Sequence, residues 1–251
     1  MGFFLTPFLR MTARIRTVMS SSSARCQQAA RGTCSSTPHT SGFPGSSVMT
    51  DAINLPEPST SGEMSVPQAI KDSASRRSYR NEGLSLDQLS QILWSAQGAT
   101  RPEEGKRAAP SAGATYPMEL FVAVGHRGVE GLDAGIYHYD SESHSIEKTH
   151  GGDLRSQISS AALGQEFLSQ APISLLLAAN YNRTTQHYGE RGKRYVHMEV
   201  GHIGQNVYLQ AEGMGLATVA VGAFRDDTVA NIFGLPAPLE PLYLMPVGYS
   251  R

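Results

Sequence analysis

Residues 195–222, YVHMEVGHIGQNVYLQAEGMGLATVAVG, are the stretch of this chain that decides its fold. Their apolar side chains recur every three or four residues, which is the spacing of one buried stripe on a helix. Gly213 and Gly215 predict the end of that helix, and residues 217–221 are expected to follow as a short buried strand. The stripe consists of Val196, Val200, Ile203, Val207, Ala211 and Met214.

Two glycines, Gly201 and Gly204, lie beside this stripe. Glycine inside a helix costs stability relative to alanine. A helix that contains both glycines is therefore expected to have a neighbour, or a flat ligand, close to its backbone.

The composition fits one domain of about 200 residues and a tail. Residues 1–50 contain five arginines and no acidic residue, so the rest of the chain has 16 basic and 22 acidic residues. This acidic body has no basic surplus for nucleic acid, and no apolar run approaches the ~18 residues of a membrane span. Both cysteines, Cys26 and Cys34, lie in the tail, which leaves the body without a disulfide framework or a thiolate metal site.

The tail, residues 1–50, is rich in Arg, Ser and Thr. This composition is typical of a transit peptide, of a disordered segment or of an upstream extension that the cell does not make. We expect a disordered tail followed by a folded domain over residues 51–251. The protein is expected in the cytoplasm, or in an organelle if the tail is a transit peptide.

Strands and helices alternate along the folded part, with one predicted hairpin. Ser85 and Gln88 form a capping box for a helix that Gly98 ends. Residues 99–117 show no apolar period and are expected to be a long loop, a kind that is often functional. The predicted strands are 118–125, 135–140, 144–150, 173–180 and 241–249, and further helices are predicted at 154–163 and after Asp226.

Two segments could bind a ligand. Arg76, Arg77, Ser78 and Arg80 could hold a phosphate dianion through charge-assisted hydrogen bonds. A solvated charged turn is the alternative, and this segment alone favours it. In residues 107–117 the small side chains would let the backbone and a serine hydroxyl approach a flat ring, unless this is an ordinary surface loop.

Common metal and nucleotide motifs are absent, so no metal site is expected. His197 and His202 are five residues apart, about 140° around a helix, whereas the zinc motif with a glutamate requires a spacing of four. Gly213-x-Gly215 lacks the third glycine and the following helix of a dinucleotide fingerprint. A phosphate-bearing cofactor would therefore have to be held by side chains.

In combination, the motifs of this chain resemble the nitroreductase superfamily, and within it the branch named for SagB and McbC, the oxidoreductases of azoline-containing peptides. Each motif alone is weak, but five in the same order are specific. The resemblance covers roughly residues 53–250. The motifs are R-R-S-x-R at 76–80, P-S-A-G-A-T-Y-P at 110–117, E-V-G-H-I-G-Q-N-V-Y-L-Q-A at 199–211, V-G-A-F at 221–224 and P-L-Y-L-M-P-V-G at 241–248.

The resemblance implies an α+β nitroreductase-like sandwich, with a central mixed sheet, flanking helices and a long central helix through which two copies dimerise. It implies that residues 51–251 bind FMN at the dimer interface. By this analogy the phosphate and ribityl chain are held by Arg76, Arg77, Ser78 and Arg80, with Arg251 completing the site. The partner subunit contributes Pro110, Ser111, Ala112 and Gly113, and the redox edge of the ring lies by the backbone of Val221, Gly222 and Ala223.

The implied activity is FMN-dependent, ping-pong hydride transfer from NAD(P)H to a nitro, quinone or other conjugated small-molecule acceptor. Tyr195 could act as a proton donor. Azoline dehydrogenases of this branch use a Lys-Tyr pair just before the long helix, whereas here Tyr195 follows Arg194, which cannot readily act as a base. A SagB/McbC-like azoline dehydrogenase and a non-catalytic flavin-binding protein are the alternatives. The expected partners are a second copy of the chain and the acceptor, with neither nucleic acid nor membrane.

Overall fold

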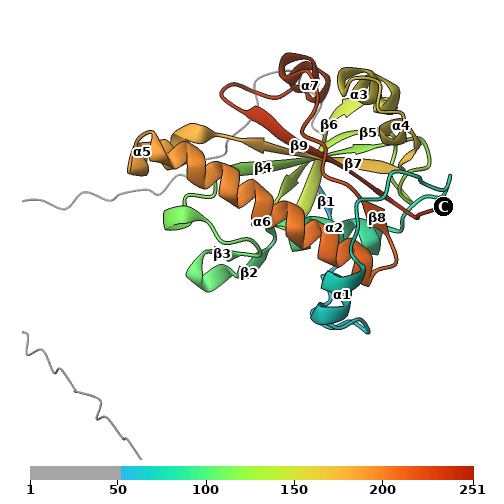
Figure 1. The fold of residues 1–251 in the computed structure, drawn as a ribbon, viewed down its shortest axis with the longest axis horizontal. Coiled ribbons are helices and arrows are strands. Elements are labelled where there is room, and N and C mark those ends of the chain that lie inside the picture. Colours follow the sequence, from blue (N-terminus) through green and yellow to red (C-terminus); the bar gives the residue numbers. More distant parts are fainter. Residues whose placement is uncertain (1–51) are drawn as a thin grey trace, which may run out of the picture. The chain divides into compact units, whose positions relative to one another are not determined.

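The computed structural model describes residues 52–251, whose centre is a seven-stranded sheet (Figure 1). The strands lie in the order β1-β6-β5-β4-β7-β9-β8, and each neighbouring pair is antiparallel. The bounds are β1 (Ile53–Asn54), β4 (Met118–Val124), β5 (Gly135–Asp140), β6 (Ser145–Gly151), β7 (Ile173–Ala179), β8 (Ala217–Thr218) and β9 (Glu240–Gly248).

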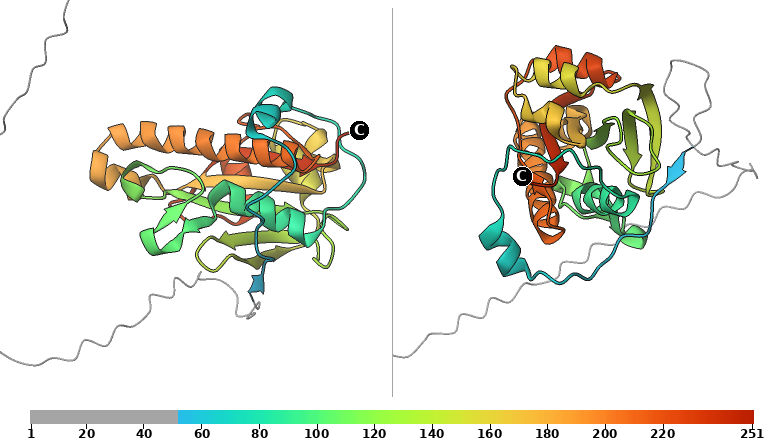
Figure 2. Two further views of the ribbon diagram at one scale, coloured as in Figure 1. Left: turned by 90° about the horizontal axis from the view of Figure 1, so that it is seen from below. Right: turned by 90° about the vertical axis from the view of Figure 1, so that its right-hand side faces the viewer.

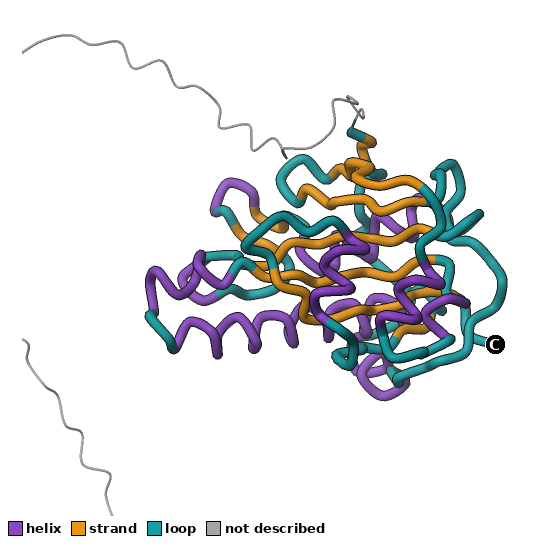
Figure 3. Tube along the Cα trace, turned by 90° about the horizontal axis from the view of Figure 1, so that it is seen from above, coloured by secondary structure: helices purple, strands orange, loops and turns teal. Residues whose placement is uncertain are grey.

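Helices pack on both faces of this sheet and produce two separate cores (Figures 1 and 2). One face is covered by α2 (Leu86–Gln97) and α6 (Arg191–Gly213), and the other by α3 (Arg155–Ala161), α4 (Phe167–Gln170) and α7 (Asp226–Phe233). Figure 3 shows these layers by secondary structure. The remaining helices are α1 (Val66–Asp72), α5 (Tyr181–Tyr188) and the 3-10 turns η1 (Pro102–Glu104) and η2 (Ala112–Ala114).

The central strand β4 shows why the sheet needs two layers of helices. Leu120 and Val122 belong to the core under α2 and α6, whereas Phe121 and Ala123 belong to the core under α3, α4 and α7. Neighbouring side chains on a strand point to opposite faces. Both sets must be buried, so the strand is apolar along its whole length, as expected from its sequence.

Helix α6 buries the apolar stripe predicted from the sequence. Val196, Ile203 and Val207 are fully buried against the sheet. A side chain at Gly204 would contact the ring of Tyr243 at 3.7 Å, so β9 is the close neighbour expected for this glycine. At Gly201 an added side chain would meet nothing within 4 Å, because this position faces outward.

The α+β fold class is confirmed, with one correction. We expected a mixed sheet, but within residues 52–251 parallel pairing occurs only as the isolated bridges of Ser75 with Thr218 and of Leu84 with Val129. Three of the six neighbouring pairs, β1-β6, β4-β7 and β7-β9, join strands that are not consecutive, and local sequence patterns do not give the relative direction of such strands. The described part of the chain shows an antiparallel sheet.

Three segments have more, or less, regular structure than predicted. Residues 99–117 are not a plain loop: they contain the hairpin of β2 (Ala99–Arg101) and β3 (Lys106–Arg107) together with η1 and η2. Residues 181–194, for which no regular element was predicted before Tyr195, contain α5 and the start of α6. The strand expected at 217–221 is shortened to β8 and a single bridge from Val221 to Leu244.

Within residues 52–251, no helix combines the length and apolarity needed to cross a membrane. The predictions of a disordered tail and of a transit peptide concern residues 1–50, which lie outside the described part.

Candidate functional site

Backbone hydrogen bonds fix the arginine segment at the edge of the sheet. The Arg76 N–H donates to the Thr218 carbonyl at 3.0 Å, and the Arg80 N–H donates to the Tyr249 carbonyl at 2.9 Å. The Arg251 N–H donates to the Ser78 carbonyl at 3.2 Å. The C-terminal segment therefore brings Arg251 to the positions that the sequence singled out. We call Arg76, Arg77, Ser78, Arg80 and Arg251 the arginine cluster.

The side chains of the arginine cluster differ in what they bind. Arg76 forms an ion pair with Glu212 at the end of α6 and donates to the Asp72 carbonyl at 3.0 Å. This pairing raises the pKa of Arg76, chiefly through its hydrogen bond to Glu212. Arg77 is exposed and makes no ion pair with any of residues 52–251, and Arg80 reaches Glu82 only at 4.0 Å. Arg77 and Arg80 are thus available to an anion.

The intervening residue, Tyr79, anchors the cluster from below. Its side chain is completely buried, and its hydroxyl lies 3.0 Å from the Arg76 carbonyl and 3.3 Å from the Pro246 carbonyl. Burial raises its pKa, so the hydroxyl keeps its proton. The residues on either side of Tyr79 are therefore held at the surface.

Tyr208, on α6, joins the arginine segment to the residues beyond β8. Its hydroxyl lies 2.7 Å from the Ser75 hydroxyl and accepts the Ala220 N–H at 2.9 Å. The following residue, Val221, exchanges two backbone hydrogen bonds with Leu244, at 2.8 and 3.0 Å. Gly222 and Ala223 then lie exposed at the surface. The structure thus links two of the predicted groups, the arginine cluster and residues 221–223.

The loop of residues 110–113, here called the small-residue loop, is held near the other end of α6. The Ser111 hydroxyl accepts the Tyr116 N–H at 2.9 Å, and the Thr115 hydroxyl lies 2.8 Å from that of Thr184 in α5. Gly113 has a φ of 60°, and a side chain there would come within 2.6 Å of the Tyr188 hydroxyl. Pro110 and Gly113 are exposed, while Ser111 and Ala112 are half-buried.

Tyr195 lies at the same end as this loop. Its ring packs edge-on against Tyr188, with 5.1 Å between the ring centroids. Tyr188 is 40% exposed and borders Gly113. The predicted proton donor and the small-residue loop are thus joined through one tyrosine.

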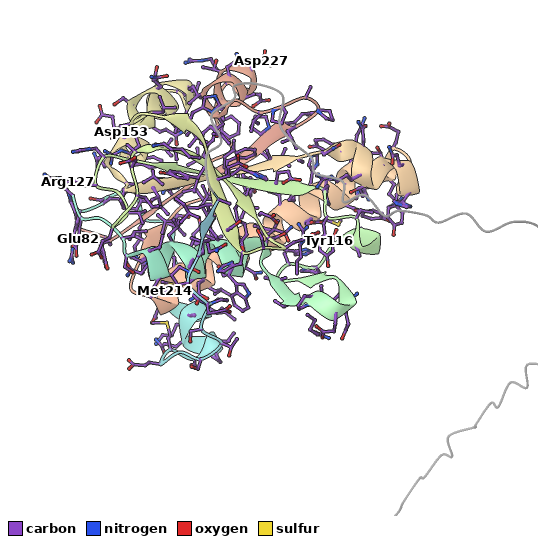
Figure 4. The ribbon with its side chains drawn as sticks, turned by 180° about the vertical axis from the view of Figure 1, so that it is seen from behind. Glu82, Tyr116, Arg127, Asp153, Met214 and Asp227 are labelled. Carbon is purple, nitrogen blue, oxygen red and sulfur yellow. The ribbon has the colours of Figure 1, made fainter. Side chains whose placement is uncertain are left out.

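The two groups of predicted residues lie at opposite ends of α6. Tyr195 reaches the small-residue loop through Tyr188, and Glu212 pairs with the arginine cluster; they are seventeen residues apart on the helix. At about 1.5 Å per residue this is roughly 25 Å. Figure 4 labels Tyr116, just after the loop, and Met214, just after α6, on separate parts of the molecule. One chain therefore does not bring the two groups together.

A family model described as the nitroreductase family matches residues 70–249 of this chain. The chain belongs to the nitroreductase family. The match covers the sheet from β4 to β9, the long helix and nearly all of the predicted site residues, but not Arg251.

Among its relatives is a protein of Methanocaldococcus jannaschii, provisionally named as a nitroreductase. It is 47% identical over 186 residues, which are 74% of this chain and 91% of that protein. The microcin B17-processing protein McbC of Escherichia coli is 29% identical over 155 residues, covering 61% of this chain and 57% of McbC. A solved structure from Ralstonia eutropha, also provisionally named as a nitroreductase, has a TM-score of 0.70 at 29% identity and covers 81% of this chain and 92% of its own.

The residues of the arginine cluster fit the phosphate of a flavin mononucleotide. Two exposed guanidiniums, the Ser78 hydroxyl and a third arginine at the chain end supply donors for a dianion. Gly222 lies four residues after Thr218, whose carbonyl accepts the Arg76 N–H, and it is exposed and has no side chain. A flat group can approach the backbone of residues 222–223.

Sequence reasoning missed four residues that organise this site. Tyr208 and Glu212 had no local signal, because their partners lie more than a hundred residues away in the chain. Glu199 and Gln97 form a buried hydrogen bond between α6 and the end of α2. Glu199 did carry a signal, since it is an acidic residue inside the apolar stripe, between Val196 and Val200. His197, which was rejected as a zinc ligand, lies 2.7 Å from the Tyr181 hydroxyl.

Proposed function

We propose that this protein is an FMN-dependent oxidoreductase in which NAD(P)H is the reductant and a nitro, quinone or other conjugated small molecule is the acceptor. The observation that carries the proposal is the pair of available guanidiniums, Arg77 and Arg80, in a segment that backbone hydrogen bonds fix to Thr218 and Tyr249. Membership of the nitroreductase family supports it. We also propose that the protein acts in the cytoplasm.

We further propose that two copies of the chain complete each flavin site. In a twofold pair of antiparallel α6 helices, the small-residue loop of one copy would lie near the arginine cluster of the other. The outward face of α6 supports this pairing, because Met198, Gly201, His202 and Gln205 form an exposed stripe at helical spacing. Met198 is 52% exposed and Val66 on α1 is 66% exposed, which is unusual for large apolar side chains that have no partner.

The chain's own groups bind and orient in this proposal. Arg77, Arg80 and Arg251 would bind the phosphate, Ser78 would donate to it, and Arg76 would hold the segment to Glu212. The backbone at Val221, Gly222 and Ala223 would face the redox edge of the flavin, and the partner's small-residue loop would cover its ring. When bound, FMN supplies two-electron transfer between the nicotinamide and the acceptor. Tyr195 lies near the small-residue loop of its own chain, so in this dimer it would hold a proton at the flavin site of the other copy.

Dehydrogenation of a peptide azoline is the alternative suggested by the relationship to McbC. The side chains in the first turn of α6 give it less support. Lys193 lies 2.8 Å from the Glu190 carboxylate, and this hydrogen bond raises the lysine pKa. A lysine that acts as a base needs a lowered pKa. Arg194, next to Tyr195, keeps its proton in any case.

Anaerobic reduction of the flavin-loaded protein tests the proposed function. We expect NADH or NADPH to bleach the visible flavin absorbance, and a nitroarene or quinone then to restore it. Tight FMN binding with no reduction by either nicotinamide would instead support a non-catalytic flavin-binding protein. Failure to bind FMN would contradict the proposal as a whole.

A further inference from the structure

Helix α5 holds the segment that follows the small-residue loop at two adjacent points. Arg183 donates through Nη1 to the carbonyl of Tyr116, which is labelled in Figure 4, at 3.0 Å. The next residue of α5, Thr184, has its hydroxyl 2.8 Å from that of Thr115. Thr184 is 1% exposed, so this contact is shielded from water. Successive residues of the helix therefore fix successive residues of the segment.

The other terminal nitrogen of Arg183 is bound to the central sheet. Nη2 donates to Oε1 of Glu119 on β4 at 2.6 Å, and Oε2 of Glu119 lies 2.9 Å from Nε2 of His138 on the neighbouring strand β5. The Glu119 side chain is 21% exposed, so the ion pair is partly shielded from water. A guanidinium presents its donors in a rigid fork. Strands β4 and β5 therefore set the place at which Arg183 holds the Tyr116 carbonyl.

The backbone of this segment has a conformation that residues with a side chain rarely adopt. Ala114 has a φ of 52° and Tyr116 a φ of 41°, in the left-handed region that favours glycine. For residues other than glycine this region costs free energy, and such a conformation persists where surrounding contacts hold it. The conformation at Tyr116 therefore depends on the partners of this residue.

Tyr116 is bound through both its backbone and its side chain. Its N–H donates to Ser111 Oγ at 2.9 Å, and its hydroxyl accepts the Arg107 N–H at 3.2 Å. The Arg107 guanidinium also lies 4.7 Å from the centre of the Tyr116 ring. Both of these partners belong to the same segment, residues 99–117. Within residues 52–251, the hydrogen bond from Arg183 is the one that connects Tyr116 to another part of the fold.

We propose that Arg183 is a positioning residue that holds the small-residue loop, through Tyr116, in the conformation that covers the flavin ring. This inference rests on the proposed function, in which the loop lies over the flavin bound to the other copy. Without Arg183 the strained backbone relaxes, and the loop has to be ordered again each time a flavin binds. Ordering a loop on binding lowers affinity. Arg183 thus acts on flavin binding through Tyr116 and needs no contact with the flavin.

The first test is flavin titration of the apoprotein, followed by fluorescence quenching. Arg183→Met keeps much of the arginine stem and removes its donors. We expect FMN to bind roughly ten-fold more weakly. Riboflavin, which has no phosphate, should lose affinity by the same factor, because the loop covers the ring that both flavins share. A loss confined to FMN would show that Arg183 acts on the phosphate, and would overturn the positioning role.

Arg155→Met is the matched control. Arg155 also donates to a carboxylate and to a backbone carbonyl, those of Asp153 and Ala171. It lies on α3, which covers the face of the sheet opposite to α6. Arg155→Met therefore loses the same kinds of contact far from the loop, and it should bind both flavins like wild type.

Thr184→Val keeps the test decisive if Arg183→Met does not fold. It removes the hydroxyl that contacts Thr115 and keeps the shape of the side chain. Both flavins should then bind a few-fold more weakly, by one neutral hydrogen bond. Wild-type affinity for both flavins in Arg183→Met, or in Thr184→Val if only that variant folds, would overturn the proposal.

A measurement without flavin separates this inference from the proposed function. The Tyr116 N–H donates to Ser111, so its hydrogen exchange reports how firmly the loop is held. This amide should exchange several-fold faster in Arg183→Met than in wild type, and Arg155→Met should exchange like wild type. If no flavin binds but this difference appears, the proposed function fails and Arg183 still holds the loop. Equal exchange in wild type and Arg183→Met would overturn the positioning role.

Discussion

The two ends of α6 hold their polar groups in opposite ways. Near its C-terminal end the arginine cluster lies at the surface, and its segment is fixed by backbone hydrogen bonds. Near its N-terminal end the carboxyl group of Glu199 is buried, and the Gln97 amide at the end of α2 donates a hydrogen bond to it. Charges that await a ligand stay in water, because burying them unpaired would be costly. The buried carboxyl group instead joins two of the protein's own helices, α2 and α6.

The largest expected effect comes from separating the two copies of the chain. In this account only a second copy brings a small-residue loop to the arginine cluster. Gly201→Trp places a bulky side chain on the outward face of α6, where one chain alone has open space. The variant should therefore fold but clash with a partner helix. We expect the dimer to weaken about a hundred-fold or more and FMN to be lost with it, as measured by light scattering and flavin content.

Gly151→Trp is the matched control, since a side chain there also meets nothing within 4 Å and Gly151 belongs to the distant strand β6. It should stay dimeric and keep its flavin. If Gly201→Trp also stays dimeric and keeps its flavin, α6 is not at the interface.

The second-largest expected effect is on FMN binding, when one side chain of the arginine cluster is removed. Removing one partner of a desolvated charge pair costs about 2–5 kcal/mol. Arg77→Ala should therefore weaken FMN binding by roughly thirty-fold or more, and riboflavin binding much less, because riboflavin has no phosphate. Flavin titration with fluorescence quenching measures both ligands.

Lys148→Ala is the control, because it removes a positive charge on β6, which lies at the opposite side of the sheet from β8. It should bind FMN like wild type. If Arg77→Ala and Arg80→Ala also bind FMN like this control, the cluster is a solvated turn.

The smallest expected effect is on the free energy of unfolding, and it comes from Glu199 near the N-terminal end of α6. Burial raises the pKa of Glu199 from 4.5 to about 7, so between these values the folded state binds more protons than the unfolded state. The free energy of unfolding therefore falls as pH rises from about 4.5 to 7, and this contribution is constant above. Through this titration wild type should lose on the order of 3 kcal/mol of unfolding free energy between pH 5 and pH 8. Glu199→Gln should not show this loss.

Urea unfolding at fixed protein concentration tests this at several pH values. The stability of Glu199→Gln relative to wild type should increase with pH, whereas Glu190→Gln should follow wild type. Parallel stability curves for wild type and Glu199→Gln would show that Glu199 does not titrate in this window.

The regular framework could be read from the sequence because its signals are local. The capping box of Ser85 and Gln88 is present at the start of α2, and the strands β4 and β7 occupy the predicted apolar runs. Helix α5 was missed because residues 181–188 have no apolar stripe. It is held instead by the Asn180 cap and by contact of Thr184 with Thr115.

Only part of the candidate site could be predicted, because only some of its residues carry a local signal. Arginines five residues apart at most, and small residues in one loop, stand out in a sequence. The pairing of Arg76 with Glu212, and of Glu199 with Gln97, depends on contacts across 136 and 102 residues. The resemblance had implied that Arg251 joins this site, and the structure shows its N–H bound to the Ser78 carbonyl. That Tyr195 reaches the loop through Tyr188 could be seen only in the structure.

The central claim is that each flavin site combines the arginine cluster of one copy with the small-residue loop of the other. Mixing two defective chains tests it directly. Arg77→Ala damages the cluster, and Gly113→Val damages the loop, because its side chain would collide with the Tyr188 hydroxyl. Each homodimer should bind FMN poorly.

A purified mixed dimer, with a different tag on each chain, would contain one site with both defects and one site with neither. We predict that it binds one FMN per dimer with the affinity of wild type. If the mixed dimer binds FMN no better than the two defective homodimers, each site lies within a single chain and the account is wrong.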